Sequence, residues 1–227
     1  MKPEIVLALD VDNFLQARQL VDKLYPTIKT FKVGSQLFTS CGHKIVEFIN
    51  KKGAKVFLDL KFFDIPNTVA KAVRAATRLK VKMMTMHILG DEEMLKAAVF
   101  AAKDEARRLR IKRPLLIGVT VLTSKEAKIN DVLILAKMGI ESGLDGVVCS
   151  AKEAGEVRKN IKGEFVIVTP GLRARGSFKN DQKRTATILE AISAGSNFLV
   201  VGRPLLEATN PKATAKAMLG EINAGRD

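Results

Sequence analysis

Short apolar segments alternate along the chain with longer segments in which apolar residues recur every three or four positions. Val69, Ala72, Val73 and Ala76 illustrate the longer type, whose spacing is that of an amphipathic helix. Continuous apolar strands separated by helices predict a parallel sheet that helices cover. The short apolar segments are residues 5–9, 30–33, 55–60, 83–87, 115–119, 146–148, 165–168 and 198–201.

The number of these strand–helix units favours a closed barrel. Eight units in 227 residues predict a single-domain (β/α)8 TIM barrel of the α/β class that spans residues 1–227; an open, doubly wound sheet is the alternative. No linker, internal repeat or low-complexity segment divides the chain. The irregular segment at about 172–183 follows the seventh strand, on the face where barrels build active sites, and we predict that it is an active-site lid.

Residues that begin and end helices agree with this pattern. Asp12 or Asn13 is suited to cap the first predicted helix, and Ser35 the second. Pro66 falls in the first turn of a helix, where proline is tolerated. Gly53 and Gly143 stand where two helices are expected to end.

Composition and charge limit the classes of function. A hydrophobic fraction of 47% with 27% charged residues is typical of a soluble protein, and no apolar run reaches the roughly 18 residues of a membrane span. The first residues lack the apolar core of a signal peptide, so we expect a cytoplasmic protein with Cys41 and Cys149 as free thiols. The net charge of +14 is spread along helical segments without interleaved aromatic residues. We therefore expect no nucleic-acid partner, no membrane partner and no metal site.

The segment 59–68, Asp-Leu-Lys-Phe-Phe-Asp-Ile-Pro-Asn-Thr, places charges inside an apolar stretch. Side chains alternate between the faces of a strand, so Asp59 and Lys61 point the same way. Buried charges are costly unless they are paired or used. One interpretation is an ion pair that only holds structure. The other is an ammonium group held among carboxylates so that it can deliver a proton.

Four ionisable residues lie at or near the carboxyl ends of three predicted strands. They are Asp10, Lys32, Asp59 and Lys61. In a barrel these strand ends meet at one mouth, where enzymes of this fold place their active sites. A structural charge network around the rim of the barrel is the alternative.

The segment 59–68 resembles the signature of the orotidine 5′-phosphate decarboxylase family. Further segments resemble that family's motifs, in its order and at compatible spacing. They are residues 7–10, 31–34, 119–124, 169–173, 181–182 and 201–204. Each motif is weak alone, but the ordered set is specific and covers about residues 4 to 207. The chain departs from bacterial members at Phe63, where they often carry His.

The resemblance implies loss of CO2 from orotidine 5′-phosphate to give UMP, without a cofactor. Lys61 would donate a proton to ring carbon C6, in a charged tetrad with Lys32, Asp59 and Asp64. The resemblance also implies a homodimer in which Asp64 enters the site of the other subunit. Asp10 and Lys32, with Asp64 and Thr68 from the partner, would hold the ribose hydroxyls.

Phosphate binding is expected after the eighth strand, where Gly202 and Arg203 suit a dianion. The resemblance adds Gln182, which closes on the phosphate, and Arg173, in a Pro-Gly-x-Arg motif. It also implies substrate contacts from Ile65 and Pro170. Thr123 is expected to contact the pyrimidine, although capping of the next helix is an equal alternative.

Two rival functions remain. Sugar-phosphate decarboxylases and aldolases of the same scaffold share Asp-x-Lys-x-x-Asp but use Mg²⁺. They carry Glu at the position of Lys32 and lack the Ile-Pro-Asn-Thr that follows Asp64 here. A basic nucleic-acid-binding protein on a degenerate barrel is the second rival, and the complete tetrad argues against it.

Overall fold

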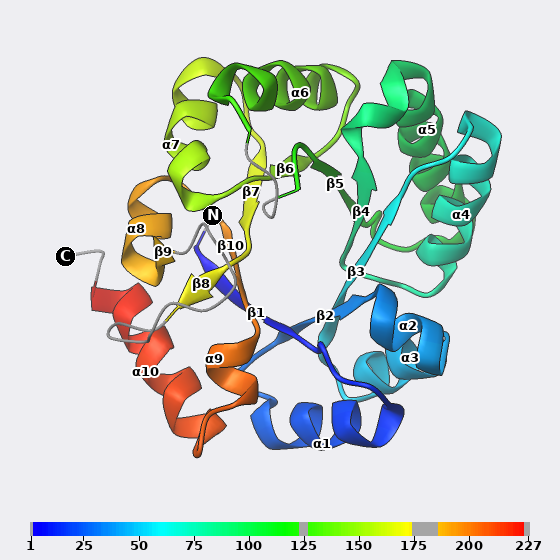
Figure 1. The fold of residues 1–227 in the computed structure, drawn as a ribbon. Helices are drawn as coiled ribbons and strands as arrows, with labels where there is room; N and C mark the ends of the chain where they lie inside the picture. Colours follow the sequence, from blue (N-terminus) through cyan, green and yellow to red (C-terminus); the bar gives the residue numbers. More distant parts are fainter. Residues whose placement is uncertain (1, 123–126, 174–185, 225–227) are drawn as a thin grey trace.

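The chain forms a closed (β/α)8 barrel in the computed structural model, which describes residues 2–122, 127–173 and 186–224 (Figure 1). The parallel strands pair in the order β1-β10-β7-β6-β5-β4-β3-β2 and close between β1 and β2. The predicted fold class is thereby confirmed, and the open sheet is excluded. The barrel strands are β1 (Glu4–Ala8), β2 (Thr30–Gly34), β3 (Lys55–Phe62), β4 (Met83–His87), β5 (Leu115–Val119), β6 (Gly146–Val148), β7 (Val166–Thr169) and β10 (Phe198–Val201).

Helices surround the barrel on the outside, as Figure 1 shows. They are α1 (Phe14–Leu24), α2 (Ser35–Cys41), α3 (Lys44–Lys51), α4 (Pro66–Arg78), α5 (Asp91–Leu109), α6 (Ile129–Glu141), α7 (Ala151–Asn160), α8 (Ile188–Ser193), α9 (Arg203–Leu206) and α10 (Pro211–Ala224), with a 3-10 turn η1 (Ile88–Gly90). Among the residues described, no helix is both long and apolar enough to cross a membrane.

A small parallel sheet, β8 (Leu172–Arg173) with β9 (Ala186–Thr187), lies beside the barrel. Leu172 and Arg173 stand at the start of the segment predicted as a lid, at about 172–183. The two residues are held because their backbone groups pair with β9. The rest of the predicted lid, 174–183, lies outside the described residues.

Most of the residues expected at helix boundaries lie at such boundaries. The Asn13 side chain accepts a hydrogen bond from the backbone N–H of Gln16 at 3.0 Å, and Pro66 occupies the first turn of α4. Gly53 and Gly143 follow helices with φ of 83° and 93°. Ser35 is not a cap: it is the first helical residue of α2, and Gly34 holds the cap position without a side-chain hydrogen bond.

Two hydrophobic cores hold the fold in the part of the chain that the structure describes. The larger one lies between the strands and the helices. The smaller one fills the barrel, and its members come from alternate positions of the strands, as the two-residue period requires. The interior residues are Val6, Ala8, Phe57, Met83, Ile117, Val166, Val168, Phe198 and Val200.

The amino end of the barrel is closed by a polar cluster. Thr30 donates a hydrogen bond to the Glu4 carboxylate, and the Lys82 ammonium lies 2.5 Å from the other oxygen of that carboxylate. Lys82 also donates to the Thr30 hydroxyl at 3.2 Å and lies 4.8 Å from the centre of the Phe198 ring. Each charge in this cluster has an opposite partner.

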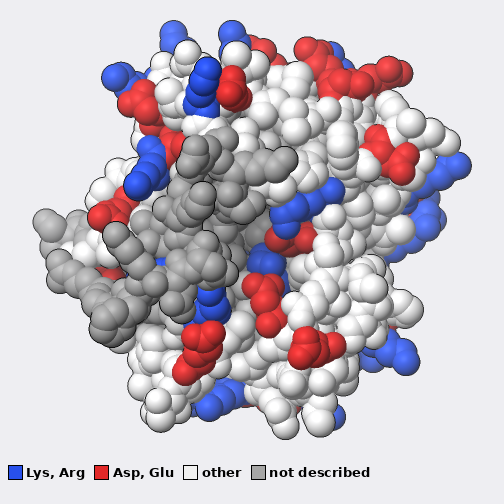
Figure 2. All heavy atoms as spheres, in the orientation of Figure 1, with Lys and Arg blue, Asp and Glu red and all other residues white. Residues whose placement is uncertain are grey.

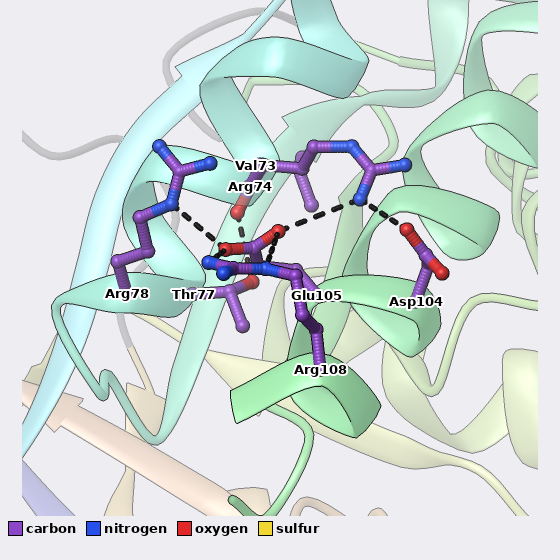
Figure 3. Close-up of polar contacts among 7 residues, drawn as sticks. All are labelled: Val73, Arg74, Thr77, Arg78, Asp104, Glu105 and Arg108. Carbon is purple, nitrogen blue, oxygen red and sulfur yellow. Dashed lines mark hydrogen bonds and ion pairs between the residues drawn. The ribbon is translucent and has the colours of Figure 1, made fainter. Parts of the chain in front are cut away.

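A second charged network joins α4 to α5 (Figure 3). Glu105 on α5 is only 2% exposed, and arginines surround its carboxylate. Arg78 Nε lies 2.8 Å and Arg108 Nη2 lies 2.5 Å from Glu105 Oε1. Arg74 Nη1 lies 3.5 Å from Oε2 and also pairs with Asp104. The hydrogen bonds from Arg108 and Arg78 lower the pKa of Glu105 to about 2.

Candidate active site

A cavity of about 440 Å³ opens at the carboxyl end of the barrel. Its lining combines apolar residues of the barrel interior, such as Phe57 and Val200, with charged residues at the strand ends. Figure 2 shows acidic and basic side chains together along the middle of one face of the molecule. The charged lining residues are Asp10, Lys32, Asp59, Lys61, Arg173, Arg203 and Glu207.

Two lysines and two carboxylates form a continuous chain of ion pairs in this cavity. Lys32 Nζ lies 3.1 Å from Asp10 Oδ1 and 3.5 Å from Asp59 Oδ2. Lys61 Nζ lies 2.9 Å from the same Asp59 Oδ2. The convergence expected from the sequence is therefore present, and Asp59 is the carboxylate that the two ammonium groups share.

Asp59 stays ionised although it is buried. Burial alone raises the pKa of its carboxyl group, but the charges of Lys32 and Lys61 and the hydrogen bonds from Lys61 and Thr85 outweigh it. The pKa therefore lies below its ordinary value. Burial, and then the charge of Lys61, lower the pKa of the nearby His87. A neutral imidazole at position 87 is not suited to act as a general acid near pH 7.

An irregular β3 brings Asp59 and Lys61 to the same cavity. The register of β3 against β4 runs from Leu58 opposite Met84 to Phe62 opposite Met86, so β3 carries two more residues than β4 over this stretch. Lys61 has a φ of 50°, which is uncommon for a residue other than glycine. Simple strand alternation correctly predicted a shared side for the two charges, but the backbone there is a bulge.

The residues expected to bind phosphate also lie at the cavity. Gly202 follows β10, and Arg203 is the first residue of the short helix α9. Both line the cavity, together with Pro170 and Arg173 from the segment after β7. The cavity therefore has cations both at the Lys61 position and at the end of the last strand.

Three further expected site residues, two of which were expected to act in the partner subunit's site, are exposed. Asp64, Ile65 and Thr68 lie at the start of α4 and are absent from the cavity lining of the chain as described. The Asp64 carboxylate accepts a hydrogen bond from the N–H of Ile65 at 2.7 Å. Thr123 and Gln182 lie outside the described residues.

One residue of the site was missed. Thr85 on β4 donates a hydrogen bond to Asp59 Oδ1 at 2.9 Å. It stands in the sequence Met-Met-Thr-Met-His, where a single hydroxyl interrupts an apolar strand beside the strand of Asp59. That interruption is the signal from which it could have been found.

Comparison with known proteins identifies the family. The model of the orotidine 5′-phosphate decarboxylase / HUMPS family matches residues 3–218. This chain belongs to that family. The expected resemblance is thus confirmed over nearly the whole length, including every strand that contributes to the cavity.

Individual members of the family are similar along their full length. An orotidine 5′-phosphate decarboxylase of Syntrophomonas wolfei is 46% identical over 96% of this chain and 97% of its own. One of Moorella thermoacetica is 43% identical over 97% of this chain and 92% of its own. The crystal structure of orotidine 5′-phosphate decarboxylase from Lactobacillus acidophilus superposes with a TM-score of 0.86 at 36% identity, covering 98% and 100% of the two chains.

Proposed function

We propose that this chain is a carboxy-lyase that converts orotidine 5′-phosphate to UMP, the last step of de novo UMP biosynthesis, with Lys61 as the proton donor. The observation that carries the proposal is the Lys61 ammonium, 2.9 Å from the buried Asp59 carboxylate, in a cavity that Arg203 also lines. The relatives that bear the name of this activity support the choice of substrate.

The reaction needs a positively charged group beside ring carbon C6, because that carbon becomes negatively charged. The bond from C6 to the substrate carboxylate breaks, CO2 leaves, and the electron pair remains on C6, where no adjacent group delocalises it. The Lys61 ammonium stabilises that charge and transfers a proton to C6. Asp59 holds Lys61 in place, and the resulting amine regains a proton from solvent. Asp59 also lies beside the substrate carboxylate.

The remaining cavity residues bind the nucleotide. The volume of the cavity, about 440 Å³, is in the range of small-molecule sites. Asp10 and Lys32, which pair at 3.1 Å, hold the ribose hydroxyls. Gly202 and Arg203 bind the phosphate, since a guanidinium group suits a dianion. Pro170 and Arg173 lie against the nucleotide, and Thr123 and Gln182 complete the contacts to the pyrimidine and the phosphate.

The active unit is a homodimer in which Asp64 completes the site of the other subunit. Two observations support this arrangement. Asp64 is exposed and outside the cavity of its own chain, in the part of the molecule described. Its two neighbours in the chain are also exposed apolar residues, Phe63 at 61% and Ile65 at 66%, of the kind that mark protein interfaces. A two-fold contact through this surface lets each subunit give and receive one Asp64.

Mixing of inactive variants tests the shared site. Lys61→Ala and Asp64→Ala should each be nearly inactive as homodimers. After joint unfolding and refolding, each hybrid dimer has one intact site and one doubly altered site. Activity should return to about a quarter of wild type under statistical pairing. If hybrids form and no activity returns, Asp64 acts within its own subunit.

The reaction itself is tested by following the absorbance of orotidine 5′-phosphate. We expect turnover that survives exhaustive chelation, because Lys61 supplies the positive charge. The Mg²⁺-dependent sugar-phosphate alternative is disfavoured because the Lys32 ammonium already lies between the Asp10 and Asp59 carboxylates. No turnover of this substrate, or turnover that chelation abolishes and Mg²⁺ restores, would contradict the proposal.

A further inference from the structure

The hydroxyl of Thr85 joins the two residues proposed for the chemistry. It donates to Asp59 Oδ1 at 2.9 Å and accepts a hydrogen bond from the backbone N–H of Lys61 at 3.0 Å. The side chain is fully buried and, among the residues described, is not part of the cavity lining. Thr85 therefore contacts Asp59 and Lys61 from the side away from the cavity and does not reach a substrate.

The bulge in β3 explains why this hydroxyl is needed. Between Leu58 and Phe62 the regular pairing with β4 is interrupted, and Thr85 is the residue of β4 that lies opposite the interruption. The Lys61 N–H has lost its place in the ladder and bonds to the Thr85 oxygen instead. A buried N–H needs such an acceptor, and the left-handed backbone of Lys61 persists only if its surroundings hold it.

The same hydroxyl sets the direction of the Asp59 carboxylate. A threonine hydroxyl has one hydrogen to donate, and here it goes to Oδ1. The other oxygen, Oδ2, is thereby turned to Lys61 at 2.9 Å and to Lys32 at 3.5 Å. One hydroxyl thus fixes both ends of the Asp59–Lys61 pair: the rotamer of the carboxylate and the backbone from which the lysine side chain extends.

We propose that Thr85 is a positioning residue, whose hydroxyl holds the bulged backbone of Lys61 and the carboxylate of Asp59 so that the ammonium group is aimed into the cavity. This inference rests on the role proposed for Lys61. A displacement of about 1 Å at a reacting group can reduce turnover by about 10²-fold. Loss of the hydroxyl should therefore reduce kcat rather than the affinity for the substrate.

The barrel contains a matched control for this hydroxyl. Thr30 is also a fully buried strand threonine whose hydroxyl donates to a carboxylate, Glu4, and accepts from a nitrogen, Lys82. It lies at the amino end of the barrel, away from the cavity. Thr30→Val and Thr85→Val remove the same group from the same kind of contact, so only a role in positioning separates their effects on turnover.

The test compares kcat, KM and the melting temperature of wild type, Thr85→Val, Thr85→Ser and Thr30→Val with orotidine 5′-phosphate. Thr85→Val should lower kcat by about 10²-fold and leave KM within a few-fold, whereas Thr85→Ser should restore most of the loss because serine keeps the hydroxyl. Thr30→Val should lower the melting temperature and leave kcat near wild type. If Thr85→Val does not fold, Thr85→Ala takes its place with the same expectation.

Three results would overturn the proposal: a kcat of the Thr85 variant within threefold of wild type, an equal loss in Thr85→Ser, or an equal loss in Thr30→Val. A crystal structure of the variant gives a readout independent of activity, since Lys61 should leave its φ of 50° when the hydroxyl is gone. An inactive wild-type enzyme would instead contradict the proposed function.

Discussion

Asp59 at the mouth of the barrel and Glu105 between α4 and α5 are both buried carboxylates surrounded by cations. Asp59 is shared by two lysines, and Glu105 is shared by three arginines. In both cases the neighbouring cations lower the pKa of the carboxyl group. Charge pattern and burial alone would therefore point to two functional sites in one chain.

The identity of the cation separates the two networks. An arginine remains protonated in proteins and fixes a carboxylate through a rigid fork of donors, whereas a lysine can give up a proton. The lysines border a cavity of about 440 Å³, while the arginines bridge two packed helices (Figure 3). A charged cluster indicates chemistry when it offers both a transferable proton and space for a substrate.

Replacement of the lysine beside Asp59 by arginine should have the largest effect on kcat. Lys61→Arg keeps the positive charge beside Asp59 but removes the proton donor, so kcat should fall by at least about 10³-fold. Steady-state turnover of orotidine 5′-phosphate measures this loss. The reciprocal change in the other network, Arg78→Lys, is the control and should leave kcat unchanged. Residual activity of Lys61→Arg within tenfold of wild type would reject Lys61 as the donor.

Removal of the central carboxylate from the helix network should affect stability alone. Glu105→Gln leaves three arginine side chains around a neutral amide, so the melting temperature should fall while kcat and KM of the folded enzyme stay at wild-type values. Asp104→Asn is the matched control, because Asp104 is only partly buried and contacts only Arg74 among the ion pairs described. An equal fall in both variants would argue against Glu105 as the centre of the network.

Acid should remove the contribution of Glu105 within a defined interval. Its pKa is lowered from 4.5 to about 2 in the folded protein, so its stabilising effect is complete above pH 4.5 and is lost as the pH falls toward 2. The difference in free energy of unfolding between wild type and Glu105→Gln should shrink over that interval. Asp59 is present in both proteins and cancels from the difference. A difference that does not change with pH would contradict the assigned pKa.

A methyl group added close to the Lys32 ammonium should have the smallest effect on kinetics. A Cβ atom added at Gly34 would lie 3.1 Å from Lys32 Nζ, so Gly34→Ala should displace that ammonium by a few tenths of an ångström and lower kcat/KM a few-fold. Gly155→Ala on α7 is the control, since nothing lies within 4 Å of its added Cβ. Equal kinetics of the two variants would show that the site tolerates such a shift.

The sequence predicted the barrel because strand and helix periods are local properties. All eight predicted strands are present: four have the predicted bounds, and the other four have ends shifted by one or two residues. The ion pairs of Lys32, Asp59 and Lys61 could also be predicted, since strand ends of a barrel must meet at one mouth. These predictions needed only the order of the elements.

The role of Thr85 could not be predicted in the same way. It depends on the two additional residues of β3 between Leu58 and Phe62, and strand register is a property of the pair of strands. The network of Glu105 was missed for a similar reason. Its partners Arg74 and Arg78 lie about thirty residues earlier, and only the packing of α4 against α5 brings them together.

The pairing of the first barrel strand with the last has a consequence for synthesis of the chain on the ribosome. β1 pairs with β10, so Glu4 finds its partner Phe198 only after nearly the whole chain has emerged. Asp10 lies shortly after β1, and Gly202 and Arg203 lie directly after β10. This part of the cavity wall therefore forms only when the two strands pair. Contacts between such distant residues form slowly and leave strand edges unpaired in the meantime. A nascent chain therefore carries Lys61 and Asp59 long before it can bind a nucleotide, and activity appears only when the final strand closes the ring.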